Sequence, residues 1–334
     1  MSASADSVSP FDDVRALANK PVEPDVAAGE AVAHQLRKFG REGDFGQLGE
    51  AAEWLARWQR RYPPRIENAL LVMFAGSHGL LQQGVSLSSD DNTRSFVDAL
   101  KTGRAPLSAI ASQAGVNIQV MELALDVPTA NIADAPAMSE RDCAATIAYG
   151  FEALANKPDC LAIGVSGAGI GTAAAAVAFA LYGGSADYWV RPSQGVPAEM
   201  TKLRAALVEK AVQCHRGRIS DPLGALAALG GRELAASVGA ILAARLQSVP
   251  VILDGFATTI AAGVVHALNP KAVSHVIAAH ATRRPAHEAA LERVDLKPLL
   301  DLEFQTGGGL GAATAVGLLR TACAPFIAEP SGRE

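Results

Sequence analysis

The sequence predicts an α/β protein built on a parallel sheet. Several short apolar runs end in glycine or aspartate and lead into segments of helical period, such as 230-GGRELAASVGAILAARLQS-248. Because the apolarity is continuous rather than alternating, these runs are typical of strands covered on both faces. Strands that alternate with helices favour a doubly wound sheet. The expected strands lie in 69-ALLVMFAG-76, 117-NIQVMELAL-125, 160-CLAIG-164, 249-VPVILDG-255 and 274-SHVIAAH-280.

The first sixty residues differ from the rest because their pattern predicts helices only. An apolar stripe at three-to-four spacing runs from Leu48 to Trp58, and the breaker 62-YPP-64 follows it. The economical interpretation is a small helical domain that the helix after Gly311 completes. We therefore expect an N-terminal part of the small domain over 1–64, a large α/β domain over 65–305, and a glycine loop with a C-terminal helix over 306–334.

Composition limits the class of partner and the compartment. The chain has 334 residues, of which 49% are hydrophobic, enough for one large core and a smaller satellite. Its formal net charge is −5 and its 29 basic residues are dispersed, so we expect neither a nucleic-acid nor an anionic-membrane surface. The four cysteines form no C-x-x-C pair, and the N-terminus has no apolar signal region. These features predict a cytoplasmic protein with reduced thiols.

The uncharged segment from Cys160 to Ala186 is long enough to span a bilayer. Glycines interrupt it, however, and its apolar content is largely alanine, which is only weakly hydrophobic. We therefore expect a short strand, a glycine turn and a buried helix in this segment.

The loop 164-GVSGAGIGTAAAA-176 is the strongest candidate for a phosphate site. Glycines that follow a strand and precede a helix let backbone N–H groups and the positive helix end approach a phosphate. The spacing misses G-x-G-x-x-G and no Walker lysine is present, so neither a dinucleotide site nor a P-loop is indicated. A tight turn for helix–sheet packing is the alternative. The candidate ligands are Gly167, Gly169, Gly171 and Thr172.

Three further positions follow expected strands, where the ligands of doubly wound sheets bind. His78 could act as an acid–base group or bond to neighbouring backbone. Asp254 could cap the following helix, which is the favoured interpretation, or contact a ligand. The loop 280-HATRRPAH-287 is by default a solvated loop, although Arg283 and Arg284 could bind an anion. Metal binding there would need a third ligand that the sequence does not offer.

Taken together, these loops resemble the nicotinate-nucleotide:dimethylbenzimidazole phosphoribosyltransferase family, which makes the lower nucleotide loop of cobalamin. The resemblance runs from about residue 10 to 320 and implies a Rossmann-like sheet flanked by helices, with a small helical domain from both chain termini, in a homodimer. Its ordered motifs are 76-GSHG-79, 136-PAM-138, the Gly164 loop, 221-DPL-223, 229-LGGRELAA-236, 250-PVILDGF-256, 280-HATRRPAH-287 and 298-PLLDL-302.

The resemblance implies transfer of phosphoribose from nicotinate mononucleotide to dimethylbenzimidazole, with no metal and no cofactor. The leaving nicotinate is already a pyridinium cation, so its departure needs no general acid. The attacking benzimidazole must lose the proton on its other ring nitrogen, and a glutamate of the family accepts it. General-base help of this kind contributes about 10²–10⁴-fold.

This chain departs from the family at that glutamate. The family's Gly-Glu-Gly-Thr-Gly-Ala-Ala string is 307-GGGLGAA-313 here, so Gly308 stands at the base position between retained glycines. Other departures also fall at positions where the family contacts its ligands, while the motifs of the scaffold survive. Gly309 and Gly311 are kept, and Ser193 and Gly195 flank the altered phosphate contact 193-SQG-195. The replaced side chains are a threonine by Leu310, a second carboxylate by Val165, a glutamine by Ser95, a glutamate by Arg284 and a lysine by Arg204.

We therefore expect the ordinary activity to be lost or strongly reduced, in a ligand-binding protein or in a partner subunit that pairs with an active paralogue as a heterodimer. The alternative is an active phosphoribosyltransferase for dimethylbenzimidazole or a related azole, with Glu303 or Asp301 as a substitute base. In both cases the expected partners are a small-molecule nucleotide and an aromatic base.

Overall fold

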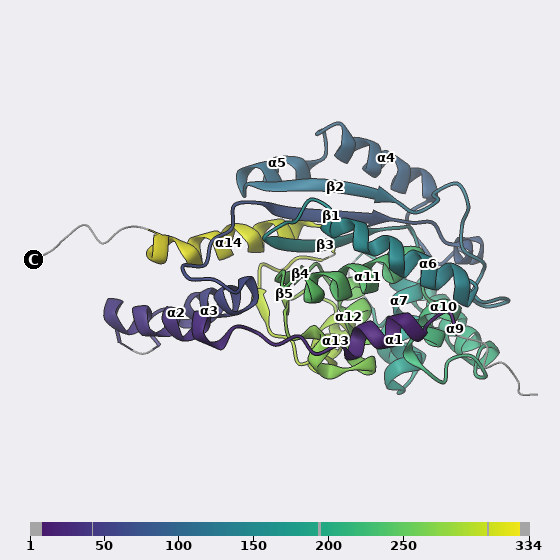
Figure 1. Cartoon of the computed structure of the whole chain (residues 1–334). Helices are drawn as coiled ribbons and strands as arrows, with labels where there is room; N and C mark the ends of the chain where they lie inside the picture. The colour runs from purple at the N-terminus through teal and green to yellow at the C-terminus, as the bar shows by residue number, and fades with distance from the viewer. Residues whose placement is uncertain (1–8, 42, 193–194, 306, 328–334) are drawn as a thin grey trace, which may run out of the picture.

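A six-stranded parallel sheet in the order β2-β1-β3-β4-β5-β6 forms the centre of the molecule (Figure 1). The structure is a computed structural model that describes residues 9–41, 43–192, 195–305 and 307–327. All five expected strands form and every pairing is parallel, which confirms the predicted fold class. The strands are β1 (Ala69–Ala75), β2 (Val116–Glu122), β3 (Cys160–Ser166), β4 (Val251–Leu253), β5 (Val276–His280) and β6 (Pro298–Leu300).

Two strands differ from the sequence expectation. β6 lies in 298-PLLDL-302 and was not among the expected strands. It is only 3 residues long, too short for its apolar residues to give a strand signal. β2 was expected to be covered on both faces, but this edge strand is only partly covered, and Ile118, Gln119 and Val120 are half-buried. Its Asn117 and Glu122 side chains are exposed.

The two faces of the sheet pack against different helices. Leu70, Val72 and Phe74 of β1 join one hydrophobic cluster, which includes side chains of the helices on that face. Leu71 and Met73 point the other way into a second cluster. Each fully buried leucine or phenylalanine contributes about 1.5–3 kcal/mol of transfer free energy. The first face is covered by α7 (Ile170–Tyr182), α11 (Arg232–Leu246) and α12 (Phe256–Leu268), and the second by α5 (Pro106–Gln113) and α14 (Leu310–Ile327).

The N-terminal helices occupy two separate places. α2 (Val26–Phe39) and α3 (Gly46–Gln59) pack as a pair beside α14 at one end of the sheet (Figure 1). Small side chains of all three helices make a satellite cluster there. α1 (Asp12–Asn19) instead packs against α12 and belongs to the large core. α14 contacts the sheet as well as α3, and the domain boundaries at 64 and 305 stay predictions.

Of the remaining α-helices in the described part of the chain, four begin at a capping side chain, while the helices that start at Ala198 and Pro285 have none. Ser139 accepts a hydrogen bond from the N–H of Asp142, and Asp221 accepts two, from Leu223 and Gly224, ahead of a proline at the first helical position. These helices are α4 (Asp90–Lys101), α6 (Glu140–Gly150), α8 (Ala186–Val190), α9 (Ala198–Cys214), α10 (Pro222–Leu229) and α13 (Pro285–Arg293).

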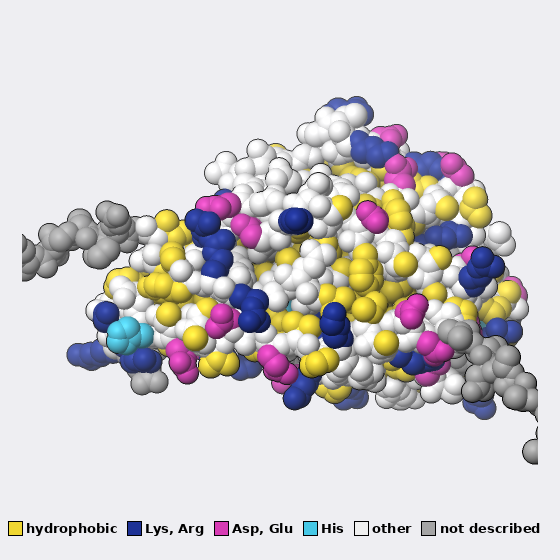
Figure 2. Space-filling view, in the orientation of Figure 1, with side chains coloured by type: hydrophobic (Ala, Val, Ile, Leu, Met, Phe, Trp, Pro, Cys, Tyr) yellow, Lys and Arg dark blue, Asp and Glu magenta, His cyan; other side chains and the backbone are white. Residues whose placement is uncertain are grey.

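The segment from Cys160 to Ala186 forms β3, a glycine turn and the buried helix α7, which confirms the sequence interpretation. Among the described helices, only α14 has the length and apolarity of a membrane span. It packs on β3, β5 and α3, so its apolar side chains have protein partners. Lys and Arg are interspersed with Asp and Glu over the face shown in Figure 2, with no continuous basic stripe.

Candidate functional site

The strand order places a cleft where the chain reverses direction. After β1 the chain goes to β2 on one side, and it then returns to β3 on the other side of β1. Ligands of open parallel sheets bind beyond the carboxyl ends of the strands at such a point. Two adjoining cavities of about 390 and 370 Å³ lie there, within the size range of small-molecule sites. They share lining residues Ser86, Ser88, Gly169, Gly171, Phe256 and Arg284.

The first cavity, called here the arginine cavity, is lined by Arg191, Arg204 and Arg284 and by the start of α7. The Nε of Arg204 donates to the carbonyl oxygen of Val85 at 2.6 Å, and the Nε of Arg284 donates to that of Gln305 at 2.9 Å. These bonds orient the two guanidinium groups. The predicted phosphate residues Gly169, Gly171, Thr172, Gly195 and Arg204 all line this cavity.

No acidic side chain balances these charges among the described residues that line the arginine cavity. Burial lowers the pKa of Arg204, and the neighbouring Arg284 lowers it further. Burial also lowers the pKa of Arg284. Gly169 has a φ of +89°, and no side chain caps the first turn of α7, so backbone N–H groups face the same region. The cavity therefore favours an anion.

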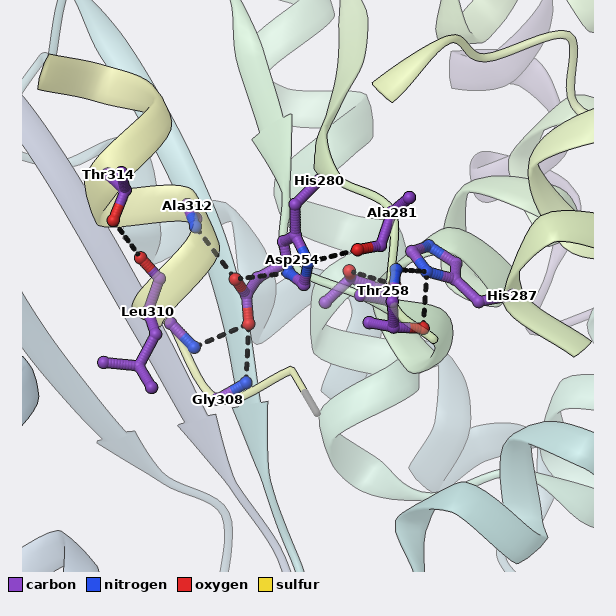
Figure 3. Close-up of polar contacts among 12 residues, drawn as sticks. Asp254, Thr258, His280, Ala281, His287, Gly308, Leu310, Ala312 and Thr314 are labelled. Atoms are coloured by element: carbon purple, nitrogen blue, oxygen red, sulfur yellow. Dashed lines mark hydrogen bonds and ion pairs between the residues drawn. The ribbon is translucent and has the colours of Figure 1, made fainter. Parts of the chain in front are cut away.

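The second cavity, called here the glycine cavity, is lined by Gly167, Asp254, Gly307 and Gly308 among others. Asp254 is buried and follows β4. Its Oδ2 accepts hydrogen bonds from the N–H groups of Gly308 at 2.5 Å and Gly309 at 2.6 Å, and its Oδ1 accepts one from Ala312 at 2.9 Å (Figure 3). Asp254 thus holds the glycine run and the first turn of α14.

The capping role of Asp254 differs from the one expected. It caps α14, which lies far along the chain, whereas the following helix α12 starts at Phe256, after Gly255, without a side-chain cap. Burial raises the pKa of Asp254, but His280 and the N–H groups of Gly309 and Ala312 outweigh burial, so that the pKa lies below its ordinary value. His280 Nε2 is 3.3 Å from Asp254 Oδ1. The carboxylate stays charged but is a weak proton acceptor.

Gly308, at the position of the family's base, has a φ of +119°. A Cβ added there would meet no atom within 4 Å, so the restriction is conformational rather than steric. L-residues rarely adopt this backbone conformation. Gly309 and Gly311 do not line either cavity. A Cβ would collide with Leu107 at Gly309 and with His280 at Gly311, so their role in the structure is close packing.

His78 does not line either cavity. It is buried, and its Nε2 lies 2.6 Å from Oε1 of Glu233 in the first turn of α11. A Cβ at Gly76 or at Gly167 would collide with a Glu233 carboxylate oxygen, so these glycines make room for the pair. Glu233 is not among the residues predicted from the sequence, although it lies in the motif 229-LGGRELAA-236.

The other predicted residues fall in different places. Ser95 is exposed on α4 and lines neither cavity. Two other residues of α4 contact the site: Thr93 Oγ1 accepts a hydrogen bond from the N–H of Ala168, and Phe96 lines the glycine cavity. Glu303 is exposed, does not line either cavity, and pairs with Arg283 at 2.6 Å. Val165 lines the glycine cavity, and Ser193 lies outside the described residues.

His280 at the end of β5 and His287 in α13 make hydrogen bonds rather than a ligand set. His287 Nδ1 accepts from the N–H of Thr282, and its Nε2 lies 3.2 Å from Thr259 Oγ1. Burial is the main cause that lowers the pKa of His287 to about 3, so its ring is neutral. Within the described part of the chain, no three His, Cys, Asp or Glu side chains group so that they could hold a metal ion.

Comparisons with known proteins agree with this architecture. A family model described as a phosphoribosyltransferase matches residues 21–329. The nicotinate-nucleotide–dimethylbenzimidazole phosphoribosyltransferase of Sinorhizobium medicae is 44% identical over 316 residues, which cover 94% of this chain and 93% of that protein. The protein of the same name from Rhizobium meliloti is also 44% identical, with the same coverage.

A solved structure gives the same result. The nicotinate-nucleotide–dimethylbenzimidazole phosphoribosyltransferase of Thermus thermophilus is 30% identical, with a TM-score of 0.82, and the match covers 90% of this chain and 96% of that chain. Similarity along nearly the whole chain includes the strands and the loops that build the cleft. This chain therefore belongs to the nicotinate-nucleotide:dimethylbenzimidazole phosphoribosyltransferase family.

Proposed function

We propose that this chain binds a phosphoribosyl nucleotide in the cleft and has lost most or all of the transfer activity named for its relatives. It acts as a ligand-binding protein or as the partner subunit of an active paralogue. The observation that carries the proposal is the glycine at position 308, where the family's glutamate would accept the proton of the attacking base. Without this base, transfer is slower by about 10²–10⁴-fold.

The surroundings of Gly308 support this proposal. Asp254 is the only acidic side chain among the described residues that line the two cavities. Both of its oxygens accept backbone hydrogen bonds, and its pKa lies below the ordinary value because His280 and these N–H groups outweigh the effect of burial. A carboxylate with a lowered pKa accepts a proton poorly at neutral pH.

The test mixes the protein with nicotinate mononucleotide and dimethylbenzimidazole and follows nicotinate release. We expect a rate at least about 10²-fold below that of the Sinorhizobium medicae relative under the same conditions. A calorimetric titration with nicotinate mononucleotide alone should still show binding. Turnover at the relative's rate would contradict the loss of activity, and absence of nucleotide binding would contradict the ligand-binding role.

A second candidate function is phosphoribosyl transfer to an azole more acidic than dimethylbenzimidazole. It is favoured by the retained cleft and by a carboxylate, Asp254, in the wall of the glycine cavity. A more acidic ring N–H needs less help from a base. Transfer to such an azole at a rate near that of the relative would support this candidate over the first.

Glu303→Gln tests the substitute base expected from the sequence. Because Glu303 pairs with Arg283 on the surface, we expect nucleotide binding and any residual nicotinate release to stay within about twofold of wild type. Stability should change by less than about 0.5 kcal/mol. A drop in residual release of more than about tenfold, with binding unchanged, would identify Glu303 as the base.

A further inference from the structure

We propose that His78 and Glu233 form a buried positioning pair for the site. The pair supports the turn at Gly167, and an imidazolium at His78 offsets the carboxylate charge of Glu233 behind the wall of the glycine cavity. Neither side chain lines a cavity, so the pair acts through Gly167 rather than by touching a ligand. This inference rests on the proposed nucleotide-binding role and names two residues on which the binding of an anion depends.

His78 and Glu233 are in direct contact and come from different parts of the fold. His78 Nε2 lies 2.6 Å from Glu233 Oε1, and both side chains are fully buried. His78 follows β1 and forms an isolated backbone bridge with Thr129, whereas Glu233 lies in the first turn of α11. The separation is short enough for a charge-assisted hydrogen bond, in which an imidazolium donates to a carboxylate.

Three glycines leave the space that the pair occupies. A Cβ at Gly76 would lie 2.3 Å from Glu233 Oε2, and a Cβ at Gly167 would lie 2.3 Å from Glu233 Oε1. A Cβ at Gly231 would lie 2.4 Å from His78 Cε1. These glycines follow β1, follow β3 and precede α11, respectively. The backbones of three separate segments therefore enclose the pair, and the pair fixes how closely they pack.

The turn at Gly167 connects the pair to the site. Gly167 lines the glycine cavity, and the carboxylate of Glu233 lies directly behind it. The N–H of Gly76 donates to the carbonyl oxygen of Ser166 at 3.0 Å, which joins the end of β1 to the same turn. The turn continues to Gly169, which precedes α7 and lines both cavities. A displacement of the pair would therefore displace the cavity wall.

The charge of Glu233 needs a partner because the carboxylate is buried. Among the described residues, His78 is its ion-pair partner, and Glu233 Oε2 has no hydrogen-bond partner. A buried carboxylate without a cation is costly, and it would also repel an anion bound in front of Gly167. Asp254 already places one carboxylate in the wall of the glycine cavity. The imidazolium of His78 prevents Glu233 from adding a second negative charge there.

Glutamine variants separate charge from geometry, because an amide can replace either partner in the hydrogen bond. His78→Gln keeps a donor for Glu233 but removes the cation, Glu233→Gln keeps an acceptor, and the double variant makes a neutral amide pair. Calorimetry with nicotinate mononucleotide measures the affinity of each protein. We expect His78→Gln to bind about tenfold more weakly than wild type, and Glu233→Gln and the double variant to bind within about threefold of wild type.

His215→Gln is the matched control. His215 is also a buried histidine, its Nε2 lies 2.8 Å from the carbonyl oxygen of Ile132, and it lines neither cavity. This variant should lose thermal stability but bind nicotinate mononucleotide within about twofold of wild type, because the contact that it loses is remote from the cavity wall. A loss of affinity in His78→Gln but not in His215→Gln therefore reports on the site.

Two results would overturn the inference. One is wild-type affinity in a His78→Gln protein that circular dichroism shows to be folded. The other is a double variant that binds as weakly as His78→Gln or more weakly, which is what a merely structural role predicts. If His78→Gln does not fold, the double variant is decisive, since near-wild-type affinity supports the pair and weak affinity contradicts it. If wild type itself does not bind nicotinate mononucleotide, the proposed nucleotide-binding role fails, which is distinct from a pair that proves unimportant in a wild type that binds.

Discussion

The two ends of the cleft differ in how their charges are satisfied. In the glycine cavity the carboxylate of Asp254 is saturated by backbone N–H groups and approached by His280, so its charge serves the fold. In the arginine cavity the guanidinium groups have backbone anchors but no acidic partner among the described lining residues. A charged side chain therefore indicates a binding site only where the protein leaves its charge unbalanced.

The glycine cavity therefore has a structural role that the arginine cavity lacks. Asp254 joins the end of β4 to the start of α14, and α14 packs on the sheet and on α3. Substitutions at this end should reduce stability, whereas substitutions among the arginines should change ligand affinity.

Asp254→Asn should have the largest effect. The amide can accept through only one oxygen and places an NH₂ group opposite backbone donors, so we expect a loss of about 3 kcal/mol in the free energy of unfolding. Urea denaturation measures it. Asp301→Asn is the matched control, because Asp301 is exposed and lies 3.7 Å from Arg283, and it should change stability by less than about 0.5 kcal/mol. Equal stability of the two variants would refute the role of Asp254 in holding the glycine run and α14.

The second-largest expected change in stability comes from lowering the pH. The pKa of His287 is lowered to about 3, and burial is the main cause. His280 and Arg284 lower this pKa further, and Asp254 raises it. Since an unfolded histidine titrates near 6.5, the unfolded state binds more protons between these values. The free energy of unfolding therefore falls as the pH falls through this window, and His287 alone contributes about 2 kcal/mol of the fall from pH 7 to pH 5. His275, whose pKa burial also lowers to about 3, adds its own contribution.

Denaturation at pH 7 and pH 5 measures this difference. His287→Gln cannot take up the proton, so its loss of stability over the same range should be smaller by that amount. His34→Gln is the control because His34 is exposed on α2, and its pH dependence should match wild type. A His287→Gln protein that loses as much stability as wild type would show that another group causes the effect.

Gly308→Ala should have the smallest effect of the three. The new Cβ has space, but a φ of +119° is unfavourable for alanine, and we expect a loss of about 1–2 kcal/mol. Gly217→Ala is the matched control, since a Cβ there also meets nothing and its φ is ordinary, and it should be neutral. Gly308→Glu carries the same backbone cost, and Val165 and Arg284 in the same cavity also depart from the family pattern, so this reversion alone should not restore transfer. A stable Gly308→Glu protein with the relative's turnover would contradict both points.

Local patterns were sufficient for much of the fold. Continuous apolar runs such as 69-ALLVMFAG-76 predicted the buried strands, because strands covered on both faces need apolar side chains at every position. The glycine-rich segment after Gly164 predicted the turn into α7, since a φ of +89° at Gly169 requires glycine. The same reasoning missed β6, whose three residues are too few for a periodic signal.

The site was only partly predictable because its contacts join distant segments. The sequence placed Gly171, Thr172 and Arg204 at a phosphate site, and the structure places them around one cavity. It did not indicate Arg191 as a third cation there. Nor did it pair His78 with Glu233, because no local pattern relates residues that meet only when α11 packs under the loop after β1.

The amino-acid sequence was enough to predict the parallel α/β architecture, the family and the missing side chain at position 308, because strand burial, motif order and residue identity can be read along the chain. The hold of Asp254 on the glycine run and the meeting of three arginines at one cavity appear only in three dimensions. A charge acts through its neighbours in space: the fold brings His280 and backbone N–H groups to Asp254, but it brings no acidic side chain among the described lining residues to these arginines.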